Sequence, residues 1–478
     1  MKRFVQGVDR TKDLPFPSRL EDYISDDNPV RVIDALVETL DLAALGFAGT
    51  VPASTGRPSY HPAVLLKIYI YGYLNRIQSS RRLERETQRN VELMWLTGRL
   101  MPDFKTIADF RKNNGPAIRN VCQQFILICQ QLDMFDDGEV AIDGSKFKAV
   151  NNRDKNFTDR KLKARIEQLE ESIARYLEEL DRSDRLPALV PPSRVKHIQE
   201  RIAALKKQIE GFNELNQQLH DAPDQQISLT DPDARSMATS GRGTGMVGYN
   251  VQTAVDTRHH LIVAHDVTNL GHDRTQLTSM ALQAQQAIHK ETMTVIADRG
   301  YFSGPEILAC EQQGLTPLLP KPLTSCNRAQ GLFDKRDFVY IPDRDEYECP
   351  ARQRAIWRCS VIERGLQFHK YWSSACPKCS IKSRCTTSIY RRISRWEHEG
   401  VLERMQQRLS ERPDVARVRR RTVEHPFGTL KAWMGATHFL SKTLPRVRTE
   451  MTLNILAYNV KRMMRIMGIQ PLIAALTG

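Results

Sequence analysis

The sequence predicts a mixed α/β protein in which a helical N-terminal region precedes a sheet that carries two insertions. Three observations lead to this class. Apolar residues recur at helical spacing before about residue 135, and short apolar strands begin at residue 139. Beyond these, one segment has a heptad pattern and another is rich in cysteine. The expected core order is strand, strand, strand, helix, strand, helix, strand, which is typical of a mixed sheet.

The composition is that of a soluble basic protein with a true hydrophobic core. Lys and Arg number 70 against 56 Asp and Glu, so the net charge is +14 over 478 residues, of which 41% are hydrophobic. About 150 residues per domain gives three domain-sized pieces or one elaborated fold. No apolar run reaches the length of about 18 residues that spans a membrane, and residues 1–4 lack a secretory signal. We therefore expect no membrane contact and a cytoplasmic location.

The positive charge favours a polyanion as partner, because clustered Lys and Arg release counterions from phosphates. A solvated basic surface is the alternative. Three arginines at every fourth residue form one ridge of a predicted helix, which suits a DNA backbone. Interleaved glutamates fit a salt-bridged surface helix equally well. The arginines of this ridge are Arg81, Arg85 and Arg89.

Several regular elements are expected around the sheet. Helices are predicted over 30–45, 62–74, 83–96 and 118–132 from their apolar spacing. The first strand covers Val140 to Ser145 and delivers Asp143 into a turn. The later strands are expected at 248–255, 260–265, 293–297 and 315–319, with a helix at 273–290. Asp298 follows the fourth of these five strands, and Pro317 limits the fifth to an edge.

Residues 160–217 form a separate module. Leu162, Ile166 and Leu169 begin one heptad run, and Val195 and Ile198 begin a second run after a proline-containing bend at 187–192. Two such runs predict an antiparallel helical hairpin whose apolar stripe is packing. A C-terminal helix over 453–467 also has one apolar side, and it is expected to close the core.

Asp143 and Asp298 are the first two candidate catalytic residues. Either one alone is typical of a turn former or a helix cap. Two carboxylates at the ends of neighbouring strands repel each other, and such an arrangement is tolerated when a divalent cation lies between them. The sequence therefore predicts a metal site at this end of the sheet.

Glu424 is the third candidate carboxylate. Arg420 precedes it by four residues and Lys431 follows it by seven, so all three fall near one face of a helix. Pro426 is expected to bend that helix just after the glutamate. One carboxylate between two cations suits a site that handles both metal and phosphate.

These residues resemble those of bacterial insertion-sequence transposases of the DDE class, whose catalytic core is ribonuclease-H-like. In that family the glutamate stands in a signature of tyrosine, two residues, arginine, three residues, glutamate, six residues and lysine. Arg420, Glu424 and Lys431 match this spacing, and Arg417 replaces the tyrosine. The other matching segments are Tyr60 to Pro62, Val140 to Asp143, Tyr249 to Gln252 and Ala297 to Tyr301.

The resemblance implies a DNA transposase that binds the terminal inverted repeats of an insertion sequence, cleaves their 3′ ends and transfers the strands to target DNA. Asp143, Asp298 and Glu424 would hold two Mg²⁺ ions, with Mn²⁺ as a substitute. The implied partners are double-stranded DNA of both ends and target, and a second copy of the chain on the DNA, which places the protein on the nucleoid. The cations implied in phosphate binding are Arg417, Arg420 and Lys431.

Asp273, Arg299 and Tyr301 are expected to support the metal ligands, with helix capping as the alternative for Asp273. Two other functions fit the same scaffold. One is a transposase-derived DNA-binding protein without catalysis, which is disfavoured because all three carboxylate positions are filled. The other is a stand-alone nuclease, which is disfavoured by the arginine and lysine signature and by the large helical N-terminus.

A cysteine cluster lies in the basic segment 321–400. Four thiolates with one CxxC pair can form a tetrahedral zinc site, and zinc would supply the folding energy that a loop-rich insertion lacks. A redox CxxC is less favoured, because no thioredoxin-like pattern surrounds it. A DNA-binding insertion and a purely structural knuckle both fit. The predicted zinc ligands are Cys349, Cys376, Cys379 and Cys385, with Cys359 and His369 as alternatives for the fourth.

The remaining thiols, Cys122, Cys129, Cys310 and Cys326, are expected to be ordinary core or loop residues. The predicted organisation therefore has six segments. They are a helical DNA-binding region (1–135), the start of the core (136–159), the helical hairpin (160–217), the continued core (218–320), the Cys-rich insertion (321–400) and C-terminal helices with the glutamate (401–478).

Overall fold

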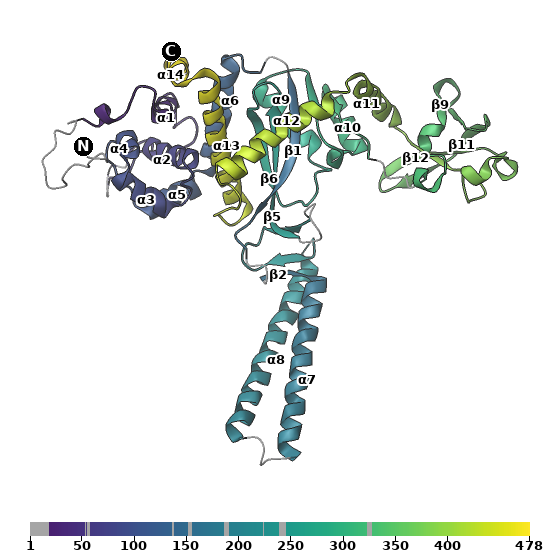
Figure 1. Ribbon diagram of the computed structural model, residues 1–478, viewed down its shortest axis with the longest axis horizontal. Helices are drawn as coiled ribbons and strands as arrows, with labels where there is room; N and C mark the ends of the chain where they lie inside the picture. The colour runs from purple at the N-terminus through teal and green to yellow at the C-terminus, as the bar shows by residue number, and fades with distance from the viewer. Residues whose placement is uncertain are drawn as a thin grey trace, which may run out of the picture.

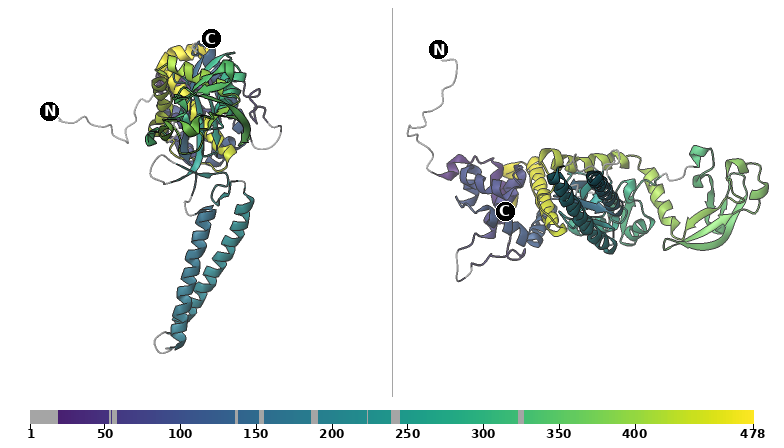
Figure 2. Two further views of the ribbon diagram at one scale, coloured as in Figure 1. Left: turned by 90° about the vertical axis from the view of Figure 1, so that its right-hand side faces the viewer. Right: turned by 90° about the horizontal axis from the view of Figure 1, so that it is seen from below.

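A mixed sheet stands in the middle of the molecule, and three other parts extend from it (Figure 1). N-terminal helices lie at one end of the long axis and a smaller sheet at the other, while a pair of long helices projects sideways as a stalk (Figure 2). The predicted mixed α/β class is confirmed. The computed structural model describes residues 19–52, 54, 58–135, 138–151, 155–185, 191–222, 224–238, 245–322 and 327–478.

The central sheet combines antiparallel and parallel pairing. β5 pairs antiparallel with β1, β4 and β6, while β1 pairs parallel with β7, and β7 with β8. β8, which contains Pro317, is at the edge as expected. The strands are β1 (Glu139–Lys148), β4 (Arg235–Met237), β5 (Met246–Asp256), β6 (Ile262–Thr268), β7 (Met293–Ile296) and β8 (Leu315–Leu318).

Helices surround this sheet and make up the N-terminal region. Two of them differ from the prediction. The helix expected over 83–96 is divided at Asn90, whose side chain accepts a hydrogen bond from Leu93 N and so caps a new helix. The helix expected over 30–45 already ends at Glu38.

The α-helices are α1 (Pro29–Glu38), α2 (Pro62–Leu74), α3 (Ser80–Arg89), α4 (Val91–Thr97), α5 (Phe104–Asn113), α6 (Gly115–Gln131), α7 (Asp159–Arg185), α8 (Pro192–Asp221), α9 (Leu277–Ile288), α10 (Gly304–Gln312), α11 (Glu399–Glu411), α12 (Val415–Gly428), α13 (Leu444–Met467) and α14 (Ile469–Thr477).

α13 joins the N-terminal helices to the sheet. It packs against α2 and α6 on one side and against β6 on the other. Leu453, Leu456, Val460 and Met463 are each no more than 1% exposed. As expected from the sequence, this helix belongs to the core, and no helix in the described parts of the chain has the length and apolarity to cross a membrane.

The stalk consists of α7 and α8, which pack against each other where the hairpin was predicted. A short two-stranded sheet, β2 (Asn156–Thr158) and β3 (Gln226–Ser228), lies at its base. Leu162 and Ile198 are fully buried, so the heptad stripe is packing as expected. The predicted bend falls largely on residues 186–190, which lie outside the described residues.

The smaller sheet has its own core. Its strands are antiparallel in the order β13-β12-β11-β10-β9. The buried apolar residues of this core are Phe338, Tyr347, Ala355, Tyr371 and Ile393. The strands are β9 (Val339–Ile341), β10 (Glu346–Glu348), β11 (Arg354–Glu363), β12 (Leu366–Trp372) and β13 (Ile393–Trp396).

Candidate active site

Strand β1 presents alternate side chains to the two faces of the central sheet. On one face Ala141 packs with Val418 of α12. On the other face Val140 and Ile142 belong to the main core, which also contains α9. Because successive side chains of a strand point to opposite faces, Asp143 shares the α12 face with Ala141.

Asp143 and Asp298 occupy equivalent positions on neighbouring parallel strands. The pairing of β1 with β7 ends at Ala141 and Ile296, and each aspartate lies two residues beyond. Asp298 follows its strand as predicted. Asp143 does not lie in a turn, because β5 continues to supply hydrogen-bonding partners and β1 runs on to Lys148. Beyond Ala141, β1 still pairs with β5 but no longer pairs with β7. The carboxylates of Asp143 and Asp298 therefore still meet where the β1–β7 pairing ends.

Arg419 of α12 bridges the two aspartates. Its Nη2 atom donates a hydrogen bond to Asp143 Oδ1 at 2.7 Å and lies 3.8 Å from Asp298 Oδ2. Burial raises the pKa of Asp143 to about 6; Arg419 opposes this shift, while the charge of Asp298 adds to it. A guanidinium thus holds together two carboxylates that would otherwise repel each other.

Glu424 does not join this pair. It is exposed on α12, five residues after Arg419, which is about 140° around the helix. Across the described ranges, no three Asp, Glu, His or Cys side chains lie close enough to hold a metal ion. Glu424 instead borders a cavity of about 560 Å³ whose lining includes Tyr458, Lys461, Arg462 and Arg465 of α13.

Of the three residues expected on one face, Arg420 and Glu424 share an exposed face of α12, whereas Lys431 does not. α12 continues past Pro426 to Gly428, and a π-helical turn, η9 (Thr429–Trp433), follows. Lys431 points to β1, where its Nζ donates to Ser145 Oγ at 2.6 Å. Arg417 and Arg420 are exposed, as are Arg81, Arg85 and Arg89 of α3.

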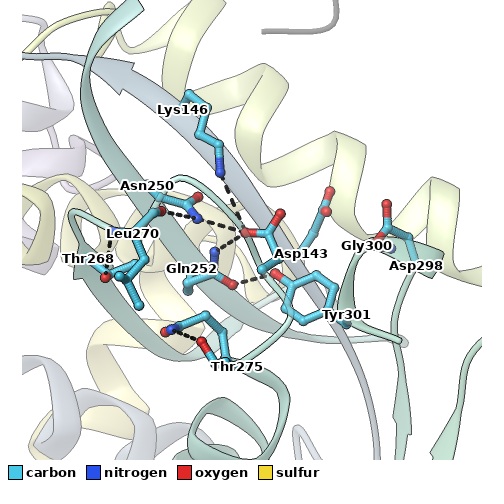
Figure 3. A network of polar contacts seen from close by, with 12 residues as sticks. Asp143, Lys146, Asn250, Gln252, Thr268, Leu270, Thr275, Asp298, Gly300 and Tyr301 are labelled. Carbon is cyan, nitrogen blue, oxygen red and sulfur yellow. Dashed lines mark hydrogen bonds and ion pairs between the residues drawn. The ribbon is translucent and has the colours of Figure 1, made fainter. Parts of the chain in front are cut away.

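A polar network joins Lys146, Asn250, Gln252 and Tyr301 beside β1 (Figure 3). It lies on the face of the sheet opposite to Arg419, because Gly144 and Lys146 alternate with Asp143 along the strand. Asp273 accepts hydrogen bonds from Asn250 Nδ2 and Gln252 Nε2, both at 2.7 Å, and lies 3.6 Å from Lys146 Nζ. The expectation that Asp273 caps a helix is therefore wrong, because α9 begins only at Leu277. The carboxylate of Asp273 is instead held by two side chains of β5.

Tyr301 extends the network toward Asp298. Its hydroxyl donates to Gln252 Oε1, and the side chain is fully buried, whereas Arg299 is exposed. Gly144 completes the packing. A Cβ atom there would lie 2.4 Å from Gln252 Nε2 and 2.7 Å from Asp273 Oδ1. The network therefore requires the bare backbone of a glycine next to Asp143.

The sequence prediction overlooked Arg419, Lys146, Asn250 and Gln252. The last two carried a detectable signal, because they are polar residues at alternate positions of an otherwise apolar strand, and both are fully buried. Arg419 carried a weaker one, since it lies four residues before Val423 on the apolar side of α12.

The four predicted zinc cysteines border one cavity at the smaller sheet, although no three of them lie close enough to hold a metal ion among the described residues. A cavity of about 30 Å³ is lined by the four thiols. Burial raises the pKa of Cys385, and negative charge on the other three adds to this. Cys359 is exposed and His369 Nδ1 hydrogen-bonds Ser360 Oγ at 2.8 Å, and neither of these alternative ligands borders this cavity.

The other thiols follow the prediction where they are described. Cys122, Cys129 and Cys310 are buried. Cys326 lies outside the described residues.

Comparison with known proteins gives two family matches. The Transposase domain (DUF772) model matches residues 18–113, and the Transposase DDE domain model matches residues 216–460, more than half of the chain. No curated protein matches the chain. A solved structure of the piggyBac transposase synaptic complex with hairpin DNA is similar at 10% identity and a TM-score of 0.32, over 95% of this chain and 79% of that one. A TM-score this low establishes no common fold. Because the Transposase DDE domain model matches more than half of its residues, the chain belongs to the DDE transposases of mobile elements.

Proposed function

We propose that this transposase binds the terminal inverted repeats of an insertion sequence, frees their 3′ ends by metal-dependent hydrolysis and joins them to target DNA. The observation that carries the proposal is the pair of Asp143 and Asp298. Two parallel strands hold these carboxylates at matching positions, and one guanidinium nitrogen bridges them.

The two aspartates suit a divalent cation. Carboxylate oxygens are the ligands that Mg²⁺ and Mn²⁺ prefer, and the Nη2 atom of Arg419 stands where a cation would neutralise both groups. Bound Mg²⁺ or Mn²⁺ would activate the attacking water or 3′-hydroxyl and stabilise charge on the phosphodiester. Asp143 and Asp298 would hold the ion, and Tyr301 and Gln252 would keep the backbone below them in place.

Glu424 is the proposed third ligand of a two-metal site. For this role α12 has to move, because Arg419 takes the side of the helix that faces Asp143. The π-helical turn η9 directly follows this segment, and such turns are common at functional sites. Arg419 would then leave the carboxylates when metal and DNA arrive.

The strand order supports a ribonuclease-H-like core. Along β6-β5-β1-β7-β8, three antiparallel strands are followed by two parallel ones, and the two aspartates lie on the central pair. This arrangement agrees with membership of the DDE family, and it favours an enzyme built around these two strands.

The DNA partner is proposed from charge and exposure. The chain has a net charge of +14. Arg81 and Arg85 of α3 and arginines of α12 are exposed and available for phosphates, whereas Arg89 is paired with Glu86. We expect two copies of the chain to act on paired ends within the bacterial nucleoid. Lys431, by contrast, acts through β1, because its ammonium group is engaged with Ser145 in the absence of DNA.

A second function is favoured by one observation. Glu424 lies apart from the aspartates, as it would in a transposase-derived DNA-binding protein that has no catalytic activity. The two functions differ in one measurable property, since only the enzyme cuts the ends when Mg²⁺ or Mn²⁺ is present.

The test is a cleavage and joining assay of the full chain on candidate terminal repeats. Asp298→Ala should abolish 3′-end cleavage and leave binding to the repeats largely intact. The matched control is Asp343→Ala, which removes an exposed carboxylate of the smaller sheet and should leave cleavage unchanged. Undiminished cleavage by Asp298→Ala would show that this carboxylate is not a metal ligand.

A further inference from the structure

Four cysteines from two separate parts of the chain surround one small cavity beside the smaller sheet. Cys349 follows strand β10, and the other three lie on the connection between β12 and β13. The cavity volume of about 30 Å³ suits a single ion or water molecule better than an organic ligand. The four thiols that line it are those of Cys349, Cys376, Cys379 and Cys385.

Both segments present their sulfurs from tight turns that begin with Cys-Pro. In the first turn Arg352 N donates to Cys349 O at 2.7 Å, and Gln353 N donates to Cys349 Sγ at 3.4 Å. In the second, Cys379 N donates to Cys376 O at 3.3 Å, and both cysteines of the CxxC line the cavity. An amide aimed at sulfur is an arrangement that stabilises a thiolate.

Two cations line the same cavity. They are Lys382 and Arg391, and the Nε atom of Arg391 is buried without a hydrogen-bond partner in the described part of the chain. Buried donors without a partner are uncommon in native proteins, and an ion or a water molecule is one common partner. Four thiolates around a divalent ion would carry a net charge of −2 and would supply that acceptor.

The surrounding fold has only a small apolar core of its own. Its core consists of five buried apolar residues, and strands β9 and β10 have three residues each. A core of this size contributes few kilocalories, and small modules commonly depend on a metal ion for folding. A cation at the cavity would tie the β10 turn to the β12–β13 connection.

We propose that Cys349, Cys376, Cys379 and Cys385 bind one structural zinc ion with tetrahedral thiolate coordination, and that Arg391 donates to these thiolates. Among the described residues, no three of these side chains already stand close enough to hold a metal ion. Zinc would therefore draw the two turns together. This inference concerns the smaller sheet alone, so it does not depend on the activity of Asp143 and Asp298.

The experiment measures zinc in the full-length protein purified without chelators. We expect about one zinc per chain, released when a mercurial reagent titrates the thiols. Cobalt substitution should give the thiolate charge-transfer bands and strong visible absorption of a tetrahedral sulfur site. The Cys376→Ser/Cys379→Ser double variant should lose zinc by about tenfold or more.

Two controls make the result specific. Cys359→Ser changes an exposed cysteine of the same sheet and should retain the full zinc content. Asp298→Ala should also retain it, whatever happens to DNA cleavage, so failure of the zinc site is distinguishable from failure of the proposed function. Arg391→Ala should keep the metal but release it faster to a chelator.

Several results would overturn the proposal. Wild-type protein that contains no zinc and gives no cobalt spectrum excludes the site, whether or not the variants fold. A disulfide between Cys376 and Cys379 in protein purified under nitrogen would replace it with a redox pair. Zinc that disappears in Cys359→Ser but persists in the double variant would locate the metal elsewhere.

Discussion

The two candidate metal sites differ in what holds their ligands. Asp143 and Asp298 stand on neighbouring strands of a sheet that belongs to the main core, and Arg419 neutralises them in the absence of metal. The four thiols stand on turns around a core of five residues, and a buried Arg391 donor there has no described partner. If both proposals hold, the first scaffold forms its site before the ion arrives, whereas the second would need the ion to complete its fold.

Metal removal should give the largest contrast between the two sites. Stripping zinc with a strong chelator should open the smaller sheet, because metal binding to structural thiolate sites is worth on the order of 10 kcal/mol. Strands β10 to β13 should then exchange amide hydrogens fast. Strands β1 and β7 should stay protected when Mg²⁺ is removed, because hydrophobic packing holds them. Equal protection in both sheets after zinc removal would contradict the comparison.

Arg419→Ala tests whether the Arg419 guanidinium occupies the position of a metal ion between Asp143 and Asp298. Without Arg419 the two aspartates repel, so the metal-free protein should lose about 2 kcal/mol of stability, less than for a fully buried pair because both carboxylates reach solvent. Mn²⁺ affinity should rise, since the competing guanidinium is gone. Thermal unfolding with and without Mn²⁺ measures both effects.

The matched control is Arg417→Ala, which removes an exposed arginine from the same helix. It should change neither quantity measurably, since exposed charges contribute little to stability. If Arg419→Ala weakened Mn²⁺ binding, the arginine would be a support for the metal and not its competitor.

The sequence predicted the strands of the sheet and the two aspartates better than it predicted their surroundings. Asp298 follows an apolar strand, a local signal that the structure bears out. The extension of β1 from Lys146 to Lys148 has no strand signal of its own, because pairing with β5 imposes it. Tertiary pairing of this kind is invisible to a local pattern.

Helix α12 shows a second limit. Spacing along the chain gave Arg420, Glu424 and Lys431 a common face, yet the rotation of the helix is set by Val418 and Val423, which pack on the sheet. That packing turns Arg419 toward Asp143. The four cysteines that border one cavity were easier to group, because three of them lie within one short connection.

Gly144→Ala should disturb the polar network below Asp143. Its Cβ would clash with Gln252 and Asp273, which hydrogen-bond each other, so neither can move freely. We expect a loss of about 1 to 2 kcal/mol in the free energy of unfolding. Denaturant titration checks this value. Gly211→Ala in α8 is the control, because a Cβ there meets open space, and it should raise helix stability by about 0.5 kcal/mol.

Lowering the pH should destabilise both regions by a smaller amount, and the cause should differ between them. In the insertion, protons compete with zinc for thiolates. In the core, burial lowers the pKa of His265 from 6.5 to about 3, and the positive charge of Arg119 adds to this; its Nε2 lies 2.9 Å from Thr452 Oγ1. As the pH falls below 6.5, the unfolded chain binds a proton that the folded chain refuses, so stability falls with pH until about pH 3.

The expected loss from His265 is about 1 kcal/mol between about pH 7 and about pH 5, reduced because the ring borders a cavity. His265→Gln keeps a hydrogen-bonding group near Thr452 but cannot titrate, so its stability should depend less on pH. Exchange of β6 amides reports this region without interference from the insertion. His272→Gln, an exposed control, should leave the pH dependence unchanged. If His265→Gln lost as much stability at low pH as the wild type, other groups would cause the acid sensitivity of the core. The two regions would then differ only in the release of metal at low pH.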